Sequence, residues 1–346
     1  MSSAAPRGGT MRAYRLERFG GPEVLAMSEV DVPQPGRGEV LVRVEASGVC
    51  GQDVMRRNGR VDQALGAIIG HEIAGRVAAV GPGIHQLQVG DRVANTQRRS
   101  CHRCAACLRG ETVLCPSGVL YGESIDGGYA DFCVIDELSL EQVPDGVGTQ
   151  DAAVAACAVG TGLHALRLAG TTAGQRVLVT GASGGVGIHA LQLARAMGAE
   201  VVAVTSSPAR TSLVARHADH VVVMSDGRFD REVRERGLQP DIVLDLTAAF
   251  TLGDSLRAVQ RGGTVVIVGN LENRPVEVLP AAFIIRETKL VGSKACTRLD
   301  LRDSLALMAR GVVRIERQRS LSLTEARRAH ELLESGEVRG RLVLTP

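Results

Sequence analysis

Four closely spaced cysteines constrain the fold of this chain more than any other feature. They lie in the segment CHRCAACLRGETVLC as Cys101, Cys104, Cys107 and Cys115, with two, two and seven residues between successive sulfurs. Thiolates at this spacing can converge on one tetrahedral metal ion, and Zn²⁺ with four cysteine ligands is a common closed structural site. The spacing therefore predicts a structural zinc lobe over about residues 98–118.

Disulfide bonds and an iron–sulfur cluster are the alternatives for these four cysteines. Disulfides need an oxidising compartment, and the sequence shows no basic-then-apolar secretory pattern, so we do not expect one. An iron–sulfur cluster also takes four thiolates, but the other motifs of the chain are more typical of a zinc protein.

The overall composition argues against several classes of partner. The 346 residues carry a net charge of +2, from 40 basic and 38 acidic side chains, so no global field favours nucleic acid or an anionic membrane. No apolar run approaches the roughly 20 residues that span a bilayer. Aromatic residues make up 2% and Trp is absent, which disfavours stacked aromatic binding platforms. We expect a cytoplasmic two-domain protein with a small-molecule substrate and no nucleic-acid or membrane partner.

The N-terminal part of the chain has the texture of short strands. Stretches rich in β-forming residues are separated by glycine and proline, at residues 39–44, 73–80 and 92–93. This spacing indicates a partly open barrel or a pair of small sheets. A last stretch of the same kind, at residues 341–344, could return to this first domain.

The pattern of apolar residues changes near residue 175. Continuous apolar runs then alternate with helical segments, at residues 177–179, 201–204, 242–244 and 265–268. Such runs are typical of strands buried on both faces, and their alternation with helices indicates a parallel sheet with helices on both sides. The sequence therefore predicts an α/β chain in which a β-rich domain is joined to a doubly wound parallel sheet.

The second domain opens on a glycine-rich turn between a strand and a helix. Residues 177–187 read VLVTGASGGVG, and an apolar helical pattern follows. Glycines at this place permit a tight turn and let a dinucleotide pyrophosphate approach the helix N-terminus. A glycine-rich turn without a ligand is the alternative. We expect a nicotinamide coenzyme, contacted by Gly181, Ser183, Gly184, Gly185, Val186 and Gly187.

The end of the next strand bears on the choice of coenzyme. NAD sites usually present Asp or Glu about twenty residues beyond the glycines, and this chain has Ser206 there, with Ser207 and Arg210 close by. Two hydroxyls and a guanidinium suit a 2′-phosphate. The alternative is that Arg210 is a solvated helix residue. We expect NADP(H) to be preferred and NAD(H) to be possible.

Three separated residues could form a second metal site. Cys50, His71 and Cys157 offer two thiolates and one imidazole, which would leave the fourth position of a catalytic zinc open. A lone buried cysteine is more often a packing residue, so the residues by themselves leave this open.

The motifs together resemble one family over nearly the whole chain. GVCGQD, GHEIAG, the four-cysteine segment, DGGYADF, GASGGVG and the closing GRLVL are similar to motifs of the zinc-containing medium-chain dehydrogenases/reductases. The resemblance implies a GroES-like catalytic domain, residues 1–158 and 295–346, and a Rossmann coenzyme domain, residues 159–294. It also implies an active site between the domains and assembly into a homodimer or homotetramer.

The resemblance also implies roles for single residues. Cys50, His71 and Cys157 would ligate the catalytic zinc, Glu72 would be a nearby carboxylate or transient ligand, and Asp53 would orient His71. With the four-cysteine lobe this gives two Zn²⁺ per chain. Thr161 would face the nicotinamide and Arg341 would reach the coenzyme phosphates. The remaining expected coenzyme contacts are Gly269 and Asn270.

One departure from the family pattern concerns proton transfer. Many alcohol dehydrogenases of the family have Ser or Thr two residues after the first zinc cysteine, where this chain has Gln52, and some have a relay His where it has Met55. An amide does not readily pass a proton, so both relay groups are missing.

Three hypotheses for the function remain. The first is a zinc-dependent alcohol dehydrogenase or carbonyl reductase, in which zinc acts as a Lewis acid on the oxygen. The second is a 2-enoyl thioester or enone reductase, because residues 178–199 and 283–295 resemble the acryloyl-CoA reductase branch of the superfamily. The third, a nucleotide-binding protein that has lost catalysis, conflicts with the intact set of candidate ligands.

Overall fold

The computed structural model describes residues 8–224, 227–269 and 275–346. The chain divides into two compact units, of which the first comprises Met1–Gly160, Ala295–Arg310 and Arg317–Pro346, and the second Thr161–Lys294 and Gly311–Glu316. The segment Gly311–Glu316 thus groups with the second unit, whereas the sequence assigned it to the first domain. Among the described residues, no helix is both long enough and apolar enough to cross a bilayer.

The first unit is rich in short strands. They are β1 (Thr10–Arg15), β2 (Ala26–Asp31), β3 (Glu39–Val49), β4 (Glu72–Val80), β5 (Arg92–Asn95), β6 (Arg98–Arg99), β7 (Val119–Leu120), β8 (Phe132–Asp136), β9 (Leu140–Gln142), β16 (Arg317–Ser322) and β17 (Arg341–Thr345). Its helices are α1 (Gly51–Arg57), α2 (Ala105–Leu108), α3 (Thr149–Val154), α10 (Arg298–Ala309) and α11 (Ala326–Glu334), with a π-helical turn at Ala155–Gly160. Short 3₁₀ turns lie at Pro22–Val24, Thr112–Leu114, Glu137–Ser139 and Leu323–Glu325.

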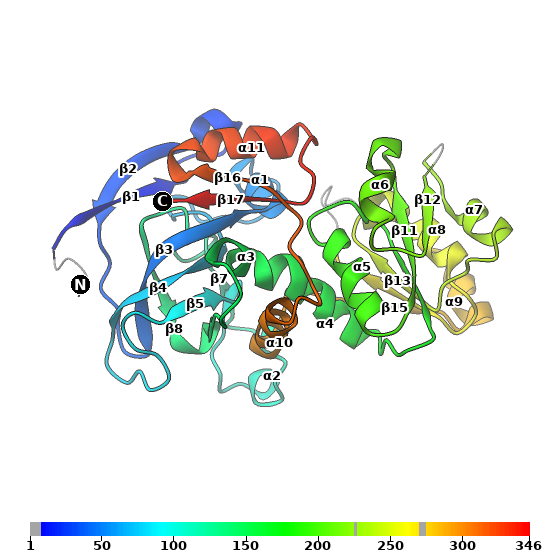
Figure 1. Cartoon of the computed structure of the whole chain (residues 1–346), viewed down its shortest axis with the longest axis horizontal. Helices are drawn as coiled ribbons and strands as arrows, with labels where there is room; N and C mark the ends of the chain where they lie inside the picture. Colours follow the sequence, from blue (N-terminus) through cyan, green and yellow to red (C-terminus); the bar gives the residue numbers. More distant parts are fainter. Residues whose placement is uncertain (1–7, 225–226, 270–274) are drawn as a thin grey trace. The chain divides into compact units, whose positions relative to one another are not determined.

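Strand β3 is the centre of the main sheet in this unit. The strand order is β16-β17-β3-β4-β5-β9, and β8 also pairs with β3. Figure 1 labels all of these strands except β9. Its run Val40-Leu41-Val42 is fully buried, with Val40 and Val42 in one core cluster and Leu41 in another. Burial on both faces explains why β3 reads as a continuous apolar run.

The antiparallel pairing of β3 with β4 determines where the first unit can build a site. The register places Gly48, near the end of β3, opposite Glu72 at the start of β4. Because antiparallel strands bring the end of one beside the start of the other, Cys50 and His71 are close although 20 residues separate them. Strand β17 flanks β3 on its other side, with Leu342 opposite Val49.

The second unit is a parallel sheet of six strands in the order β12-β11-β10-β13-β14-β15. These strands are β10 (Arg176–Val179), β11 (Glu200–Thr205), β12 (His220–Val223), β13 (Ile242–Asp245), β14 (Thr264–Ile267) and β15 (Lys289–Gly292). Its helices are α4 (Thr161–Leu168), α5 (Gly187–Ala196), α6 (Thr211–Val214), α7 (Asp230–Glu235), α8 (Ala248–Ala258) and α9 (Pro280–Arg286), with a 3₁₀ turn at Pro208–Arg210.

This strand order is that of a doubly wound dinucleotide-binding sheet. The order reverses between β10 and β13, and ligands of such sheets bind beyond the carboxyl ends of the strands at that point. The predicted glycine-rich turn follows β10 directly. The predicted fold class, a β-rich domain and a doubly wound parallel sheet, is confirmed.

Candidate metal centres and coenzyme site

Four side chains of the first unit converge as the sequence predicts for a catalytic metal site. One ligand atom each from Cys50, His71, Glu72 and Cys157 lies within 4.8 Å of the others. The Cys50 and Cys157 sulfurs are 3.9 Å apart. The residues come from the end of β3, the start of β4 and the π-helical turn, so three separate segments build the cluster.

Asp53 links two of these residues from behind. Cys50 is the N-cap of α1, and its backbone N–H donates to Oδ2 of Asp53 at 3.0 Å. The other carboxylate oxygen lies 2.9 Å from Nδ1 of His71. A carboxylate only accepts, so in the neutral ring Nδ1 carries the proton and Nε2 offers its lone pair to the cluster. This is the arrangement in which a histidine binds zinc.

The polar atoms of the cluster are suited to a cation. Nε2 of His71 and Oε2 of Glu72 are buried and have no hydrogen-bond partner in the structure. Unsatisfied buried polar atoms are rare because they carry a desolvation penalty. An imidazole nitrogen beside two cysteine sulfurs is a donor set that Zn²⁺ takes in catalytic sites, so the residues fit this metal.

The electrostatics of the cluster favour a thiolate at Cys50, whereas the hydrogen bond with Cys50 and burial raise the pKa of the Cys157 thiol. The hydrogen bond from Cys157 lowers the pKa of the Cys50 thiol well below its usual value, although burial acts in the opposite direction and His71 adds a smaller lowering. Burial lowers the pKa of His71, but Asp53 and Cys50 outweigh it, so that this pKa is raised well above normal. Thiolates are the form in which cysteine binds metals.

Glu72 is held by an arginine from the C-terminal strand. The Arg341 guanidinium on β17 pairs with Oε1 of Glu72, and both side chains are buried. Burial raises the pKa of Glu72, and Arg341 partly offsets that effect. A Cβ on Gly48 would lie 1.9 Å from Oε2 of Glu72, so only glycine leaves room for this carboxylate. The sequence predicts coenzyme contact for Arg341, and the structure places it on Glu72.

Cys157 reaches the cluster from the π-helical turn Ala155–Gly160, between α3 and α4. The turn is built of small residues and is fully buried. A Cβ on Gly160 would lie 2.9 Å from the Cys296 sulfur, which requires glycine there. π-Helical turns are rare and occur often at functional sites. No pattern in the sequence predicts this turn.

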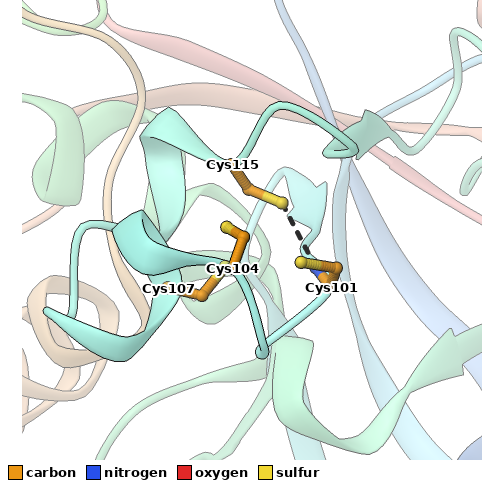
Figure 2. Close-up of side chains that lie close together, drawn as sticks. All are labelled: Cys101, Cys104, Cys107 and Cys115. Carbon is orange, nitrogen blue, oxygen red and sulfur yellow. Dashed lines mark hydrogen bonds between the residues drawn. The ribbon is translucent and has the colours of Figure 1, made fainter.

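The four-cysteine lobe also converges on one point (Figure 2). One sulfur each from Cys101, Cys104, Cys107 and Cys115 lies within 4.8 Å of the others. The backbone N–H of Cys101 donates to the Cys115 sulfur at 3.3 Å. Hydrogen bonds from the backbone N–H groups of Arg103 and Cys104 lower the pKa of Cys101 to about 6. Burial and the hydrogen bonds with Cys104 and Cys115 raise the pKa of Cys107 to about 12, so the lowering at Cys101 does not extend to Cys107. Four converging sulfurs fit a closed structural zinc site.

The glycine-rich turn of the second unit has the geometry of a dinucleotide-binding turn. Gly181 adopts φ +57°, which favours glycine. A Cβ on Gly187 would lie 2.4 Å from the carbonyl oxygen of Gly181, so glycine is needed where α5 begins. The carbonyl of Val204 in β11 accepts the Ala182 N–H at 3.1 Å. The turn therefore presents the N-terminus of α5 to a ligand.

His189, in the first turn of α5, contacts the glycine-rich turn and was not predicted from the sequence. Its Nε2 lies 3.0 Å from the backbone N–H of Glu316 and must accept from it. Nδ1 then carries the proton and donates to the carbonyl of Gly185 at 2.7 Å. His189 thus ties the glycine-rich turn to the segment 311–316. A polar residue inside an otherwise apolar helical pattern was its only sequence signal.

The other predicted residues lie as follows. Ser206 and Ser207 come directly after β11, with Arg210 at the end of the 3₁₀ turn that follows. Gly269 follows β14, and a Cβ there would lie 2.4 Å from the carbonyl oxygen of Leu246. Asn270 lies outside the described residues.

Three further residues considered from the sequence lie in α1 or at the start of the second unit. Gln52 is exposed in the first turn of α1, and Met55 on the same helix is buried. Thr161 is buried at the start of α4 in the second unit.

Sequence signatures of two known domains match the chain. The "Alcohol dehydrogenase GroES-like domain" matches residues 36–145, and "Zinc-binding dehydrogenase" matches residues 185–310. The acryloyl-coenzyme A reductase of Metallosphaera sedula is 33% identical over 319 residues, 92% of this chain and 95% of its own. The alcohol dehydrogenase of Geobacillus stearothermophilus is 34% identical over 345 residues, 96% of this chain and 99% of its own.

Solved structures agree with these relatives. The crystal structure of AibC is 42% identical with a TM-score of 0.93, covering 98% of this chain and 96% of that one. A cobalt- and zinc-bound thermostable alcohol dehydrogenase from Pyrobaculum aerophilum is 29% identical with a TM-score of 0.90, covering 98% and 100%. The matched domain families and the relatives identify the chain as an oxidoreductase. The chain belongs to the medium-chain dehydrogenase/reductase superfamily, as its motifs predict.

Proposed function

We propose that this oxidoreductase is a zinc-dependent, nicotinamide-linked reductase that acts on the conjugated carbon–carbon double bond of a 2-enoyl thioester. The observation that carries the proposal is the pair Gln52 and Met55, which stand two and five residues after Cys50 in the sequence. Neither side chain can pass a proton from a substrate oxygen to solvent. Acryloyl-coenzyme A reductases from Metallosphaera sedula and Sulfurisphaera tokodaii match 92% and 98% of this chain, which supports the same choice.

The chemistry of this reaction explains why the relay matters. Conjugate reduction adds hydride to the β-carbon and a proton to the α-carbon, whereas alcohol oxidation removes a proton from oxygen. When bound, zinc would supply Lewis acidity toward a carbonyl oxygen and the coenzyme would supply hydride. Reduction of an enoyl thioester uses Lewis acidity at the carbonyl oxygen but needs no proton path from that oxygen to solvent.

The residues of the first unit would each serve the metal in a defined way. Cys50, His71 and Cys157 would hold it. Asp53 fixes the ring of His71 through Nδ1 at 2.9 Å and so keeps Nε2 directed at the cluster. Glu72 forms an ion pair with Arg341. Its carboxylate would stay next to the metal and would be available as a further ligand.

Alcohol oxidation or carbonyl reduction is the second candidate. It was the first hypothesis from the sequence, and the intact Cys50, His71 and Cys157 set supports it. The similarity to alcohol dehydrogenases of Geobacillus stearothermophilus supports it as well. In that case the proton would leave through water.

Replacing Gln52 with threonine separates the two candidates. The new hydroxyl would restore a proton path, so alcohol oxidation is expected to rise by at least about tenfold, because a well-placed proton-transfer group contributes about 10²–10⁴-fold. Enoyl-thioester reduction is expected to change by less than about twofold, because its proton is needed at the α-carbon. This change is well below the contribution of a proton-transfer group. Steady-state rates with a panel of alcohols, aldehydes and enoyl thioesters measure both.

Gln52→Ala is the matched control, because it removes the amide without adding a hydroxyl. Rapid alcohol oxidation by the unaltered protein, with no gain in Gln52→Thr, would contradict the missing relay. Absence of enoyl-thioester reduction in the unaltered protein would refute the main proposal.

We further propose that the coenzyme is NADP(H). A 2′-phosphate held by Arg210 and the hydroxyls of Ser206 and Ser207 would gain about 1.5–3 kcal/mol, or roughly ten- to a hundredfold in affinity. Arg210→Ala is therefore expected to weaken NADPH binding by that factor and to leave NADH binding unchanged. Fluorescence titration gives both dissociation constants.

Arg231→Ala is the control for this prediction, because Arg231 is an exposed arginine of α7 paired with Glu235. An unaltered protein that binds NADH as tightly as NADPH would contradict the assignment.

The predicted homodimer or homotetramer also stays a proposal. The open edge strand β15, with Leu290, Ile284 and Ile285 exposed near it, supports such an assembly. The cytoplasmic location stays a prediction.

A further inference from the structure

A row of buried polar side chains lies behind the metal cluster in the first unit. An Arg57 guanidinium nitrogen lies 3.5 Å from Nδ1 of His330, and Nε2 of His330 lies 3.2 Å from the Tyr129 hydroxyl. His330 and Tyr129 have no exposed surface, and Arg57 is 1% exposed. The three residues come from α1, α11 and the segment before β8. None of them has a role in the proposed reaction.

One end of the row is attached to the helix that begins at Cys50. Arg57 is the last residue of α1, and Cys50 is its N-cap. Glu334 on α11 binds the Arg57 guanidinium through two hydrogen bonds, at 2.6 and 3.1 Å. The carbonyl of Gly20 accepts from Nε of Arg57 at 3.1 Å. The helix is thereby fixed at the end opposite to the cysteine.

The other end of the row meets the residue before His71. The Tyr129 ring occupies the place of a side chain on Gly70, because a Cβ there would lie 2.3 Å from the ring. The Tyr129 N–H also donates to the carbonyl of Ile69 at 2.9 Å. The Tyr129 ring and backbone therefore define the path of the chain into His71.

The hydrogen-bonding pattern requires a neutral imidazole in the middle. Arginine only donates, so Nδ1 of His330 faces it as an acceptor, and Nε2 carries the proton and donates to the Tyr129 oxygen. Burial lowers the pKa of His330 to about 4, which keeps the ring neutral. The ring also packs edge-on against Tyr129, with ring centroids 5.8 Å apart. Both ring nitrogens and one ring edge are thus in use.

We propose that His330 is a positioning residue for the metal site, which keeps the segments of Cys50 and His71 at the spacing that zinc requires. This inference rests on the proposed catalytic zinc. Zinc accepts sulfur at about 2.3 Å and nitrogen at about 2.0–2.1 Å, so small displacements of either segment weaken binding. Loss of a direct hydrogen-bond partner of a metal ligand typically costs 10–100-fold in metal affinity, and for His330, which acts one contact further out, we expect the lower end of this range.

The test is the rate at which zinc leaves the folded, full-length protein for an excess of a coloured chelator. Three variants are compared with the unaltered protein: His330→Phe, which removes both nitrogens; Tyr129→Phe, which removes only the hydroxyl; and Leu332→Ala. Leu332 is a buried apolar residue of α11 outside the row, so its variant controls for general loss of stability. Cys50→Ala should lack the kinetic phase in which the catalytic site releases its zinc. Comparison with this variant therefore identifies that phase in the other proteins.

We expect His330→Phe to accelerate release from the catalytic site by about tenfold or more, and Tyr129→Phe to accelerate it by a smaller factor. Release from the four-cysteine lobe should not change. Cobalt substituted for zinc gives a second readout, because its visible absorption reports the ligand geometry and should shift in both variants.

Three outcomes would overturn the inference. Release at the unaltered rate from Tyr129→Phe and from folded His330→Phe would refute it while leaving the zinc site intact. Equal acceleration of zinc release in Leu332→Ala would show that the effect comes from general destabilisation of α11 and not from the contacts of His330. A protein whose zinc content does not respond to Cys50→Ala would refute the catalytic site, and the inference with it.

Discussion

Replacing Cys50 with alanine is expected to abolish turnover and to leave the fold intact. Cys50 supplies one of two sulfurs that lie 3.9 Å apart at the candidate catalytic site. Loss of an outer partner already weakens metal sites by 10–100-fold, so loss of a ligand should lower kcat/KM by more than about a hundredfold. Metal analysis should fall from close to two zinc ions per chain to close to one. Circular dichroism should be unchanged.

Cys133→Ala is the control for this experiment. Cys133 is buried in the same unit, lies outside both cysteine clusters, and burial raises its thiol pKa. Its variant is expected to keep both zinc ions and most of the activity. Full activity of Cys50→Ala would contradict a zinc-assisted mechanism, and one zinc per unaltered chain would place Cys157 in doubt as a ligand.

Replacing Cys104 with alanine is expected to unfold the lobe over about residues 98–118. Besides the two-residue strand β6, the lobe contains only a four-residue helix and short turns, with little buried apolar surface of its own. Structural zinc contributes folding free energy directly, about 10–16 kcal/mol in zinc-finger peptides, so loss of one of four ligands should cost several kcal/mol locally. Limited proteolysis should cut the variant within the lobe, and metal analysis should lose one zinc.

Leu108→Ala is the control here, because Leu108 is an exposed apolar residue of the same short helix. It should resist protease like the unaltered protein. A Cys104→Ala variant that keeps two zinc ions and resists protease would show that the lobe does not depend on metal.

The fold was predictable where local pattern and burial agree. Strands β10, β11, β13 and β14 are buried on both faces, so each leaves a continuous apolar run in the sequence. Strand β15 was not predicted because it is an edge strand, largely exposed, with Lys289 at its start. Strand β12 was not predicted because it is the other edge strand, begins at His220 and buries only Val222 fully.

The candidate site was predictable only in part, because its geometry depends on non-local pairing. The four-cysteine lobe is local, and spacing alone indicated it. The second cluster depends on the register of β3 with β4, which shifts between Val44 and Ala46, and no residue pattern encodes that register. His330 and Tyr129 are 201 residues apart in sequence, so their contact could not be inferred before the fold was known.

Because of the π-helical turn at Ala155–Gly160, the number of residues between α3 and Cys157 matters for the metal site as much as the identity of the ligands. Each residue of a helix turns the chain by about 100°. Deleting a single alanine before Cys157 would rotate its sulfur by about that angle relative to α3 and away from Cys50, with every candidate ligand still present. Relatives that differ here by a one-residue insertion or deletion should therefore be treated as lacking this metal site, however complete their cysteines and histidine are.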